Sequence, residues 1–481
     1  MDKCIIDAVK LILIIAGLGG FLYGVDFGVI AAAEPYMKAM GVYTDAQISH
    51  IVGAVLLGGL VSSITAGWLC DFFGRKKMIV ASAAMFLAAI PVVSLSLGSY
   101  PFLYAGRVLQ GMSAGYMAVV MPMYITETLP PAIRGRGTGV FQFFLGLGLV
   151  VAAGAGCLVA TYYGASDTAD AAERAAAWGA NFWWTMLPVA VLFVGSLRLP
   201  ESPVWLSRGS RLVVRDSCDA TNHDLRTTNH EPRTTDHEPR TTNHEPRTTD
   251  HEPRTTNREP RTTLFQRRYV LPFLLACLVL TFNKTTGMSS FTSYLVTILH
   301  SAGFEGIYAN WGQLAVKLTN MLVTIAAAAL VDRKGRTWLL RVGTGGMTLG
   351  LAAIGSVFLA IERFGVQPNN FTGLLTMFAF FFMQVFYALG PGLCVWLVLS
   401  ELMPKRIRAN GMAIALFMNQ LVAWGLASWF RPWVAAWGWS SMFFFFAVNG
   451  VLYFVTSCFI PETKGKSLDE LENLFEKKAK N

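Results

Sequence analysis

The chain has 481 residues, of which 53% are apolar and 14% are charged, and its formal net charge is +9 at pH 7. Soluble proteins usually carry about a quarter charged residues, so this composition excludes an ordinary soluble globular protein. The charges are also unevenly distributed, because long apolar segments alternate with short polar loops along most of the chain.

Twelve apolar segments account for most of the chain, and each is near the roughly 20 residues that an α-helix needs to cross a bilayer. Backbone groups inside lipid have no water to bond, so we expect each segment to be a helix. The approximate limits are 11–33, 48–70, 78–98, 101–124, 138–163, 182–199, 270–298, 308–331, 338–360, 371–400, 410–430 and 440–460. The sequence therefore predicts an all-α membrane protein with twelve transmembrane helices.

Lysine and arginine gather in alternate loops between these segments. The basic loops contain Arg75, Lys76 and Lys77, then Arg134 and Arg136, then Arg333, Lys334, Arg336 and Arg341, then Lys405, Arg406 and Arg408. The other loops carry few basic residues, namely Lys38, Arg174, Arg363 and Arg431. Basic loops tend to stay on the cytoplasmic side, so we expect both termini to be cytoplasmic. The positive net charge is then a signal of membrane topology and does not indicate nucleic-acid binding.

A short motif occurs twice, each time between the second and third apolar segments of one half of the chain. Its copies are Gly67-Trp68-Leu69-Cys70-Asp71-Phe72-Phe73-Gly74-Arg75-Lys76-Lys77 and Leu330-Val331-Asp332-Arg333-Lys334-Gly335-Arg336. Duplicated halves are typical of membrane transporters. We expect an N-terminal six-helix bundle at 1–207, a cytoplasmic linker at 208–268, a C-terminal six-helix bundle at 269–463 and a cytoplasmic tail at 464–481.

The predicted linker contains five tandem seven-residue units at 227–261, in which proline recurs every seventh position. This composition cannot bury a core, so we predict disorder. Five of the seven histidines lie at 223–251, but repeat expansion explains them better than metal binding does. The seven cysteines are scattered, and they predict neither a disulfide framework nor a metal site.

Ionisable residues are few inside the predicted spans, where a charge is costly, and we consider three of them: Asp26, Arg107 and Lys284. Asp26 and Arg107 could form a purely structural ion pair. We favour a proton site, because burial and a nearby arginine both alter how readily a carboxylate takes up a proton. Lys284 could extend to an interface along its aliphatic stem, contact a carboxylate or phosphate, or pair with Asp26.

Charged residues at the inner ends of the spans also recur in both halves. Glu127 and Glu401 each precede an arginine by seven residues. The alternative, solvated charges at helix ends, is weakened by this recurrence. We predict cytoplasmic charge networks that hold the halves together when the inner gate is closed. Their members are Asp71, Arg75, Glu127, Arg134, Asp332, Arg336, Glu401 and Arg408.

Polar amides and one tryptophan within the spans are candidates for lining a central cavity. A single amide is more often a hydrogen bond between helices than a ligand contact. As a set, however, they can bind hydroxyl groups, and an indole offers an apolar face to a sugar ring. The residues are Gln142, Asn283, Asn320, Trp396, Asn419 and Gln420. No catalytic triad, phosphate-binding glycine loop or metal-ligand set appears in the sequence, so we expect neither an enzyme nor an ATP-driven pump, and no cofactor.

These motifs together resemble the sugar porter family of the major facilitator superfamily over nearly the whole chain outside the linker. Pro-Glu-Ser-Pro after the sixth span and Pro-Glu-Thr-Lys-Gly after the twelfth are the most specific. The matching segments are Gly24 to Ile30, Asp71 to Lys76, Gly106-Arg107, Pro122 to Glu127, Arg134-Gly135, Pro200 to Leu206, Asp332 to Arg336, Gly390-Pro391 through Trp396 to Glu401, and Pro461 to Gly465.

The resemblance implies two six-helix bundles that give alternating access to a central site, a sugar or polyol as substrate, and the plasma membrane as location. It also implies that Asp26 and Arg107 couple a proton to sugar, since facilitative members tend to carry Asn at the position of Asp26. The residues implied to contact the sugar are Gln142, Asn320, Trp396 and Asn419. The sequence does not indicate an oligomeric state.

The seventh span departs from the family pattern, which usually has two glutamines and an asparagine at positions where this chain has Asn283, Lys284 and Ser289. An ammonium replaces one amide and a hydroxyl replaces the asparagine, while Gln420 stands where a tryptophan is common. We predict proton-coupled import of a hexose or related sugar or polyol. The alternatives are a facilitative carrier, an organic-anion carrier that uses Lys284, and a non-transporting nutrient sensor.

Overall fold

The computed structural model describes residues 3–96, 98–207, 267–304, 306–403 and 408–462, so the linker repeats and the predicted tail lie outside the described residues. Within these ranges the chain is almost entirely helical. The helices are α1 Lys3–Ala39, α2 Asp45–Phe73, α3 Arg75–Leu95, α4 Tyr100–Thr128, α5 Pro131–Tyr163, α6 Ala171–Trp183, α7 Met186–Leu197, α9 Arg267–Thr285, α10 Met288–Ser301, α11 Tyr308–Lys334, α12 Arg336–Arg363, α13 Asn370–Leu389, α14 Pro391–Leu402 and α15 Arg408–Phe459.

Eleven helical stretches in the described residues are long and apolar enough to cross a membrane. Three of them join two helices each: α6 with α7, α9 with α10, and α13 with α14. The last stretch is broken at Gly438, whose φ is 79°. At this break the Glu362 carboxylate accepts the backbone N–H groups of Trp439 at 2.6 Å and Ser440 at 3.2 Å. Counting α15 as two spans confirms the predicted twelve.

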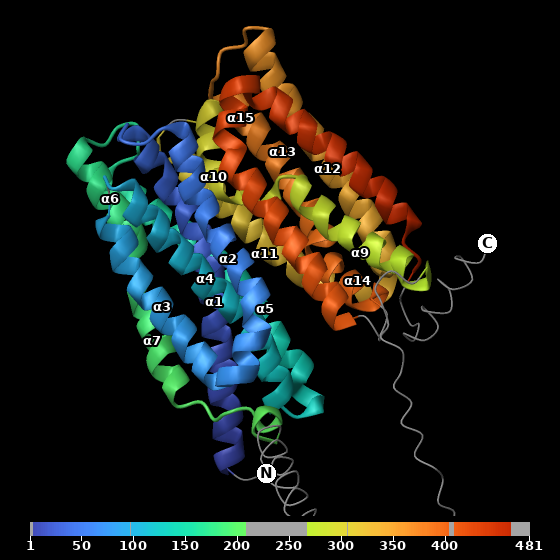
Figure 1. The fold of residues 1–481 in the computed structure, drawn as a ribbon. Helices are drawn as coiled ribbons and strands as arrows, with labels where there is room; N and C mark the ends of the chain where they lie inside the picture. Colours follow the sequence, from blue (N-terminus) through green and yellow to red (C-terminus); the bar gives the residue numbers. More distant parts are fainter. Residues whose placement is uncertain (1–2, 97, 208–266, 305, 404–407, 463–481) are drawn as a thin grey trace, which may run out of the picture.

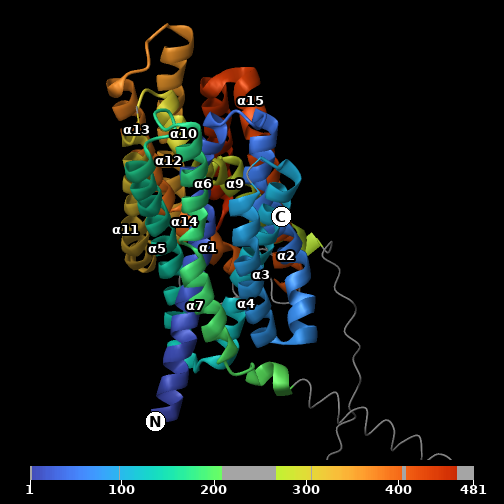
Figure 2. The ribbon, with the colours of Figure 1, turned by 90° about the vertical axis from the view of Figure 1, so that its left-hand side faces the viewer.

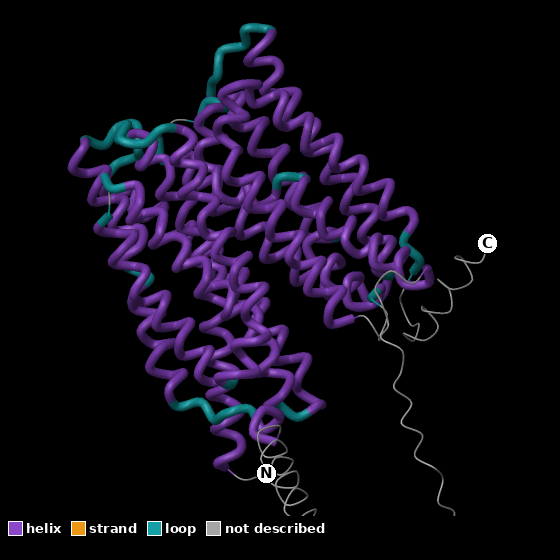
Figure 3. The backbone as a smooth tube through the Cα atoms, viewed as in Figure 1, coloured by secondary structure: helices purple, strands orange, loops and turns teal. Residues whose placement is uncertain are grey.

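The helices form two bundles that lie side by side, α1–α7 in blue to green and α9–α15 in yellow to red (Figure 1). The bundles pack against each other where α1 meets α10, α2 meets α15 and α5 meets α11. Their ribbons converge near the upper end of the molecule and diverge toward the lower end, where the N-terminus lies (Figure 1). The view turned by 90° shows the helices running lengthwise through the molecule (Figure 2), and the loops lie mostly at helix ends (Figure 3).

The backbones of α2 and α4 touch where small residues meet. A Cβ on Gly58 of α2 would lie 2.3 Å from the carbonyl oxygen of Val108 in α4, and Gly111 of α4 faces the backbone of α2 in the same way. The Ser62 hydroxyl lies 2.9 Å from the carbonyl oxygen of Gly58 and 2.8 Å from that of Met112. Small residues allow membrane helices to approach this closely.

The duplicated motif has the same backbone geometry in both halves. Gly74, between α2 and α3, has φ 94° and ψ 161°, and Gly335, between α11 and α12, has φ 93° and ψ 158°. Only glycine adopts this region readily. Glu201 accepts the first backbone N–H of α3 at 2.9 Å, and Glu462 accepts that of α12 at 3.0 Å. The glutamates of the two Pro-Glu motifs thus stabilise the N-termini of these helices.

Candidate functional site

Asp26 and Arg107 face one another inside the N-terminal bundle. Asp26 in α1 is fully buried, and Arg107 in α4 is 1% exposed. Arg107 Nη1 donates to Asp26 Oδ1 at 3.5 Å and to Gln110 Oε1 at 2.7 Å. The second carboxylate oxygen, Asp26 Oδ2, has no hydrogen-bond partner among the described residues. The predicted pair therefore forms in the structure, but as a long contact in which the arginine is shared with an amide.

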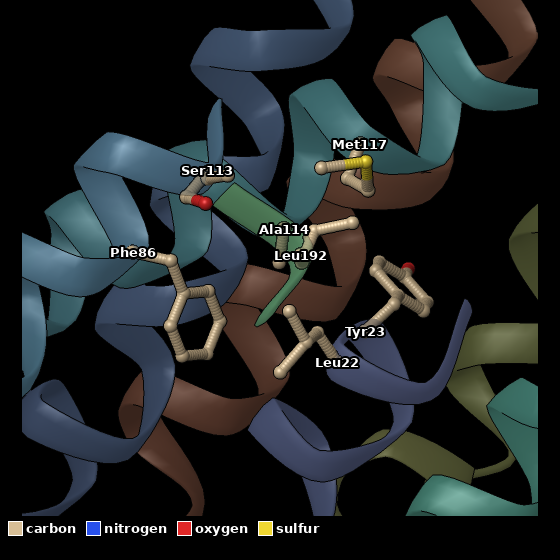
Figure 4. Close-up of a pocket in the computed structure, with 8 residues that line it drawn as sticks. Leu22, Tyr23, Phe86, Ser113, Ala114, Met117 and Leu192 are labelled. Carbon is tan, nitrogen blue, oxygen red and sulfur yellow. The ribbon is translucent and has the colours of Figure 1, made fainter. Parts of the chain in front are cut away.

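A small pocket lies among α1, α3, α4 and α7 of the same bundle (Figure 4). Its walls are mostly apolar, with the hydroxyl groups of Tyr23 and Ser113 among them (Figure 4). The cavity volume of about 10 Å³ is at the lower limit of what a single water molecule needs. This pocket is too small for a sugar, and the predicted substrate-binding residues lie elsewhere.

The residues predicted to bind substrate are spread over both bundles. They are Gln142 in α5, Asn283 and Lys284 in α9, Ser289 in α10, Asn320 in α11, Trp396 in α14, and Asn419 and Gln420 in α15. Gln142 and Trp396 are exposed, Asn283 and Asn419 are buried, and the others are half-buried.

Several of these residues make contacts that the sequence did not specify. Lys284 Nζ donates to Ser289 Oγ at 3.3 Å across the break between α9 and α10. Gln420 Nε2 lies 2.9 Å from the place that a Cβ on Gly59 of α2 would occupy, so it packs against the opposite bundle. Within the described ranges, no hydrogen bond links Gln142 to Lys284, Ser289 or Gln420.

One face of α11 is polar along much of its length. Its residues follow at intervals of three or four, the spacing of a single helical face: Asn310, Gln313, Lys317, Asn320 and Thr324. Gln384 of α13 donates Nε2 to Asn320 Oδ1 at 2.7 Å. Lys317 is 6% exposed. Of this face we predicted only Asn320, although the spacing itself would have revealed the rest.

Several buried amide atoms have no hydrogen-bond partner in the described part of the chain: Asn283 Nδ2, Gln313 Nε2 and Oε1, and Asn419 Oδ1. Buried polar atoms are nearly always paired, so unpaired ones mark places where a ligand or water can bond. The group offers both donors and acceptors. A hydroxyl can donate and accept, so a polyhydroxylated molecule matches this set.

Arg75 is the centre of a charge network at the lower end of the N-terminal bundle. Its Nε and Nη2 donate to the two oxygens of Glu127 at 2.9 and 3.0 Å. Its Nη1 donates to Asp71 Oδ1 at 3.1 Å and to the Cys70 carbonyl oxygen at 3.0 Å. The Ser202 hydroxyl also donates to Glu127. The sequence predicted Asp71, Arg75 and Glu127 as one network, and the structure brings them together.

The corresponding network of the C-terminal bundle contains Arg336 and Glu401, whose Nε and Oε1 are 3.5 Å apart. This ion pair lies within one bundle, as do the ion pairs that Arg75 forms with its two carboxylates. The side chains of Arg134, Asp332 and Arg408, which we also assigned to these networks, lie outside the described part of the structure.

Arg431 is placed differently from the sequence expectation. We assigned it to a loop after the eleventh span, whereas the structure places it inside α15 with 6% of its surface exposed. The reason is that the helix continues to Gly438 before it breaks, so the expected loop is mostly helical. The side chain therefore lies against the opposite bundle, where carboxylates compensate its charge.

The fold and the polar site define a membrane transporter built from two six-helix bundles. The family model described as "Sugar (and other) transporter" matches residues 12–475, so the chain belongs to this family of transporters and the expected sugar porter assignment is confirmed.

Relatives with named substrates cover almost the whole chain. It is 27% identical over 469 residues to the arabinose-proton symporter of Bacillus subtilis (strain 168), and the aligned region covers 96% of this chain and 93% of that protein. It is 28% identical over 461 residues to the galactose-proton symporter of Escherichia coli (strain K12), spanning 95% and 92%. The inward open xylose transporter XylE from E. coli superposes with a TM-score of 0.72 at 22% identity, over 96% of this chain and 99% of that chain. This likeness confirms the fold.

Proposed function

We propose that this transporter imports a hexose or a related sugar or polyol together with a proton, across the plasma membrane and with both termini in the cytoplasm. The buried pair of Asp26 and Arg107 carries the proposal, because a carboxylate inside a membrane span marks a proton site when it can change its charge. The unpaired amides of the C-terminal bundle and the named relatives support a sugar or polyol as the substrate.

In the proposed cycle, Asp26 takes up a proton from the outer side. The carboxylate then no longer attracts Arg107, and the guanidinium keeps Gln110 as its acceptor. The substrate bonds to the amides of α9, α11 and α15 that lack partners within the described part of the protein. The bundles then rock, and substrate and proton leave on the inner side.

The inner charge networks centred on Arg75 and Arg336 contribute to this cycle by stabilising the lower end of each bundle. In the conformation with the inner gate closed, we propose that the same charges pair across the two bundles. Each charged side chain then exchanges a partner in the opposite bundle for a partner of similar strength in its own bundle, so the halves separate at a low net cost in free energy.

Asp26→Asn tests the coupling. Cells without their own carriers are supplied with labelled sugars and polyols at outside pH of about 5.5 and about 7.5. The unchanged chain should accumulate one of them above its outside concentration at the acid pH. Asp26→Asn should lose this accumulation yet still exchange labelled for unlabelled substrate, because binding and rocking do not need the proton. Asp170→Asn, an exposed helix-capping position where asparagine caps equally well, is the matched control.

Three results would contradict this proposal. If uptake of labelled substrate by the unchanged chain is the same at both outside pH values, the protein would be a facilitative carrier. Accumulation that survives in Asp26→Asn would place the coupling proton elsewhere. Binding of sugar without flux under any gradient would indicate a non-transporting sensor.

A second candidate, a carrier of anionic sugars, is favoured by two lysines. Lys284 and Lys317 lie in the C-terminal bundle, and neither pairs with a carboxylate among the described residues. Lys317 is buried and Lys284 is half-buried, and a buried charge is normally paired, so a substrate carboxylate would supply the missing partner. Galacturonate is then expected to compete with labelled galactose, and Lys317→Gln to abolish this competition. Lys77→Gln, at an exposed lysine, is the control.

A further inference from the structure

A buried amide side chain lies beside the pair of Asp26 and Arg107. Gln110 follows Arg107 by three residues on α4, so the two side chains are neighbours on that helix. Gln110 is 1% exposed, and its Oε1 accepts a hydrogen bond from Arg107 Nη1 at 2.7 Å. The same nitrogen lies 3.5 Å from Asp26 Oδ1. The arginine therefore makes its shorter contact with the neutral amide and its longer contact with the charged carboxylate.

Another arginine of the N-terminal bundle shows how much closer such a pair can be. Arg75 donates Nε and Nη2 to the two oxygens of Glu127 at 2.9 and 3.0 Å. Two parallel bonds of about 2.7–2.9 Å are common between a guanidinium and a carboxylate. Arg107 instead offers Asp26 one nitrogen at 3.5 Å. The pair of Asp26 and Arg107 is thus held apart in comparison with the pair of Glu127 and Arg75.

Two atoms of the Asp26 site are left without a hydrogen bond by this arrangement. Arg107 Nε and Asp26 Oδ2 are buried, and neither has a partner among the described residues. Gln110 bonds the guanidinium on one side, and the ring of Phe182 in α6 lies 5.8 Å from the guanidinium carbon, within the range of a cation–π attraction. Gln110 and Phe182 therefore stabilise the position of Arg107 in which its Nε does not reach the carboxylate.

The distance between the two charges decides how readily Asp26 binds a proton. A close positive charge with hydrogen bonds to the carboxylate favours the ionised form, and the attraction weakens with distance. Because Arg107 is partly held by Gln110, the ionised form of Asp26 is less stabilised than a close pair of two bonds would make it. Asp26 should therefore take up its proton at a less acid pH than it would in such a pair.

We propose that Gln110 is a positioning residue that sets the pH at which Asp26 takes up the coupling proton. Its amide oxygen keeps Arg107 from closing on the carboxylate when Asp26 is ionised. It also remains as the acceptor of Arg107 when Asp26 is protonated, so the guanidinium keeps its charge and its place in both states. This inference deepens the proposed proton-coupled import and rests on it.

Other groups around Asp26 do not explain a proton exchange near neutral pH. Arg107 of α4 is the charged group that acts on it, and Tyr23 of α1 interacts with it electrostatically. A tyrosine loses its proton only near about pH 10, so Tyr23 keeps its charge state over the range tested below. Where α5 meets α1 on either side of Asp26, the contacting residues are Leu145, Leu149 and Ala152, which do not titrate.

The experiment follows the Asp26 proton directly by infrared spectroscopy. The full chain is purified, reconstituted in lipid nanodiscs and titrated from about pH 4 to about pH 9. A protonated carboxyl group and a carboxylate absorb at different frequencies, and the band of Asp26 is the one that Asp26→Asn removes in the same background. The midpoint of this band against pH is compared between variants.

Gln110→Met has a side chain of similar length without the amide oxygen, and it should lower the midpoint by about one pH unit, because Arg107 can then close on Asp26. Gln110→Glu should raise the midpoint by a similar amount, because the added carboxylate competes with Asp26 for the charge of Arg107. Asn181→Leu is the matched control. Asn181 is another buried amide of this bundle and bonds the carbonyl oxygen of Ala177 at 2.9 Å, so this variant should keep the midpoint of the unchanged chain.

An equal midpoint in Gln110→Met and the unchanged chain, or an equal shift in Asn181→Leu, would overturn the proposal. So would the absence of any band that Asp26→Asn removes, because Asp26 would then not exchange a proton in this range. Should Gln110→Met fail to fold, Gln110→Glu decides alone, and a midpoint that does not rise would count against the positioning role.

The failure of this inference is distinguishable from the failure of proton-coupled import. The infrared titration needs no transported substrate, so a chain that imported no sugar would still show whether Gln110 controls the Asp26 proton. Conversely, accumulation that depends on pH, together with an unmoved midpoint in Gln110→Met, would leave the coupling intact and refute the role of Gln110 alone.

Discussion

Replacing Gly58 with alanine is expected to destabilise the N-terminal bundle. A Cβ at this position would lie 2.3 Å from the carbonyl oxygen of Val108, 2.5 Å from the backbone nitrogen of Met112 and 2.7 Å from the carbonyl carbon of Gly111. All three atoms belong to the backbone of α4, which cannot turn aside as a flexible side chain can. Since Cβ contacts essentially never fall below 3.0 Å, α2 and α4 must separate by at least 0.7 Å at this crossing (3.0 − 2.3).

The separation has a cost beyond Gly58 itself. A gap of about 0.5–1 Å forfeits roughly a quarter to a half of the dispersion attraction between facing atoms. Overpacking costs about 1–3 kcal/mol in general, and the better helix propensity of alanine offsets up to about 1 kcal/mol of this. We therefore expect the free energy of unfolding to fall by about 1–2 kcal/mol.

Gly67→Ala is the matched control, because Gly67 lies on the same helix and nothing lies within 4 Å of the place of its Cβ. That variant should be neutral or slightly stabilised. The thiols of Cys70, Cys157 and Cys394 are buried, so a thiol-reactive fluorescent dye can follow thermal unfolding of the purified protein. Equal melting temperatures for the two variants would refute the close backbone contact between α2 and α4.

Three further predictions concern hydrogen bonds. Gln384→Leu should raise KM for the transported sugar about tenfold with little change in kcat, because Asn320 loses a hydrogen-bond donor that lies 2.7 Å away. Initial uptake rates over a range of sugar concentrations measure both constants. An unchanged KM would speak against Asn320 as a substrate contact held in place by the Gln384 amide. Glu201→Gln should lower the free energy of unfolding by about 1 kcal/mol, followed in the dye assay. The reason is that the Glu201 carboxylate accepts the first two backbone N–H groups of α3 at 2.9 and 3.0 Å. An unaltered melting temperature would exclude this cap as a stabilising contact. Ser62→Ala should lower the free energy of unfolding by about 0.5–1.5 kcal/mol. Its effect should be less than additive with that of Gly58→Ala, because both substitutions act at one helix crossing. Strict additivity in the double variant would show that the two substitutions act independently.

The twelve spans follow from the sequence alone, because every segment inside lipid must satisfy its own backbone and so must be both apolar and helical. Asp26 and Arg107 are recognisable in the same way, since a charge within an apolar span is costly and is kept only with a partner or a function. The duplicated turn is also local, because the φ values of Gly74 and Gly335 depend on glycine at those places. Each of these features can be read from a short stretch of chain.

The tertiary structure decided which faces meet. Arg431 looks like a loop residue in the sequence, and only its partner Glu34, 397 positions away, explains its burial. The polar face of α11 is visible as a spacing, but the burial of Lys317 depends on the helices that cover it. Gly58 matters because the backbone of α4 crosses there. Pairing and burial arise between segments far apart in the chain, and a local pattern of apolar and polar residues does not encode which neighbour a helix will have.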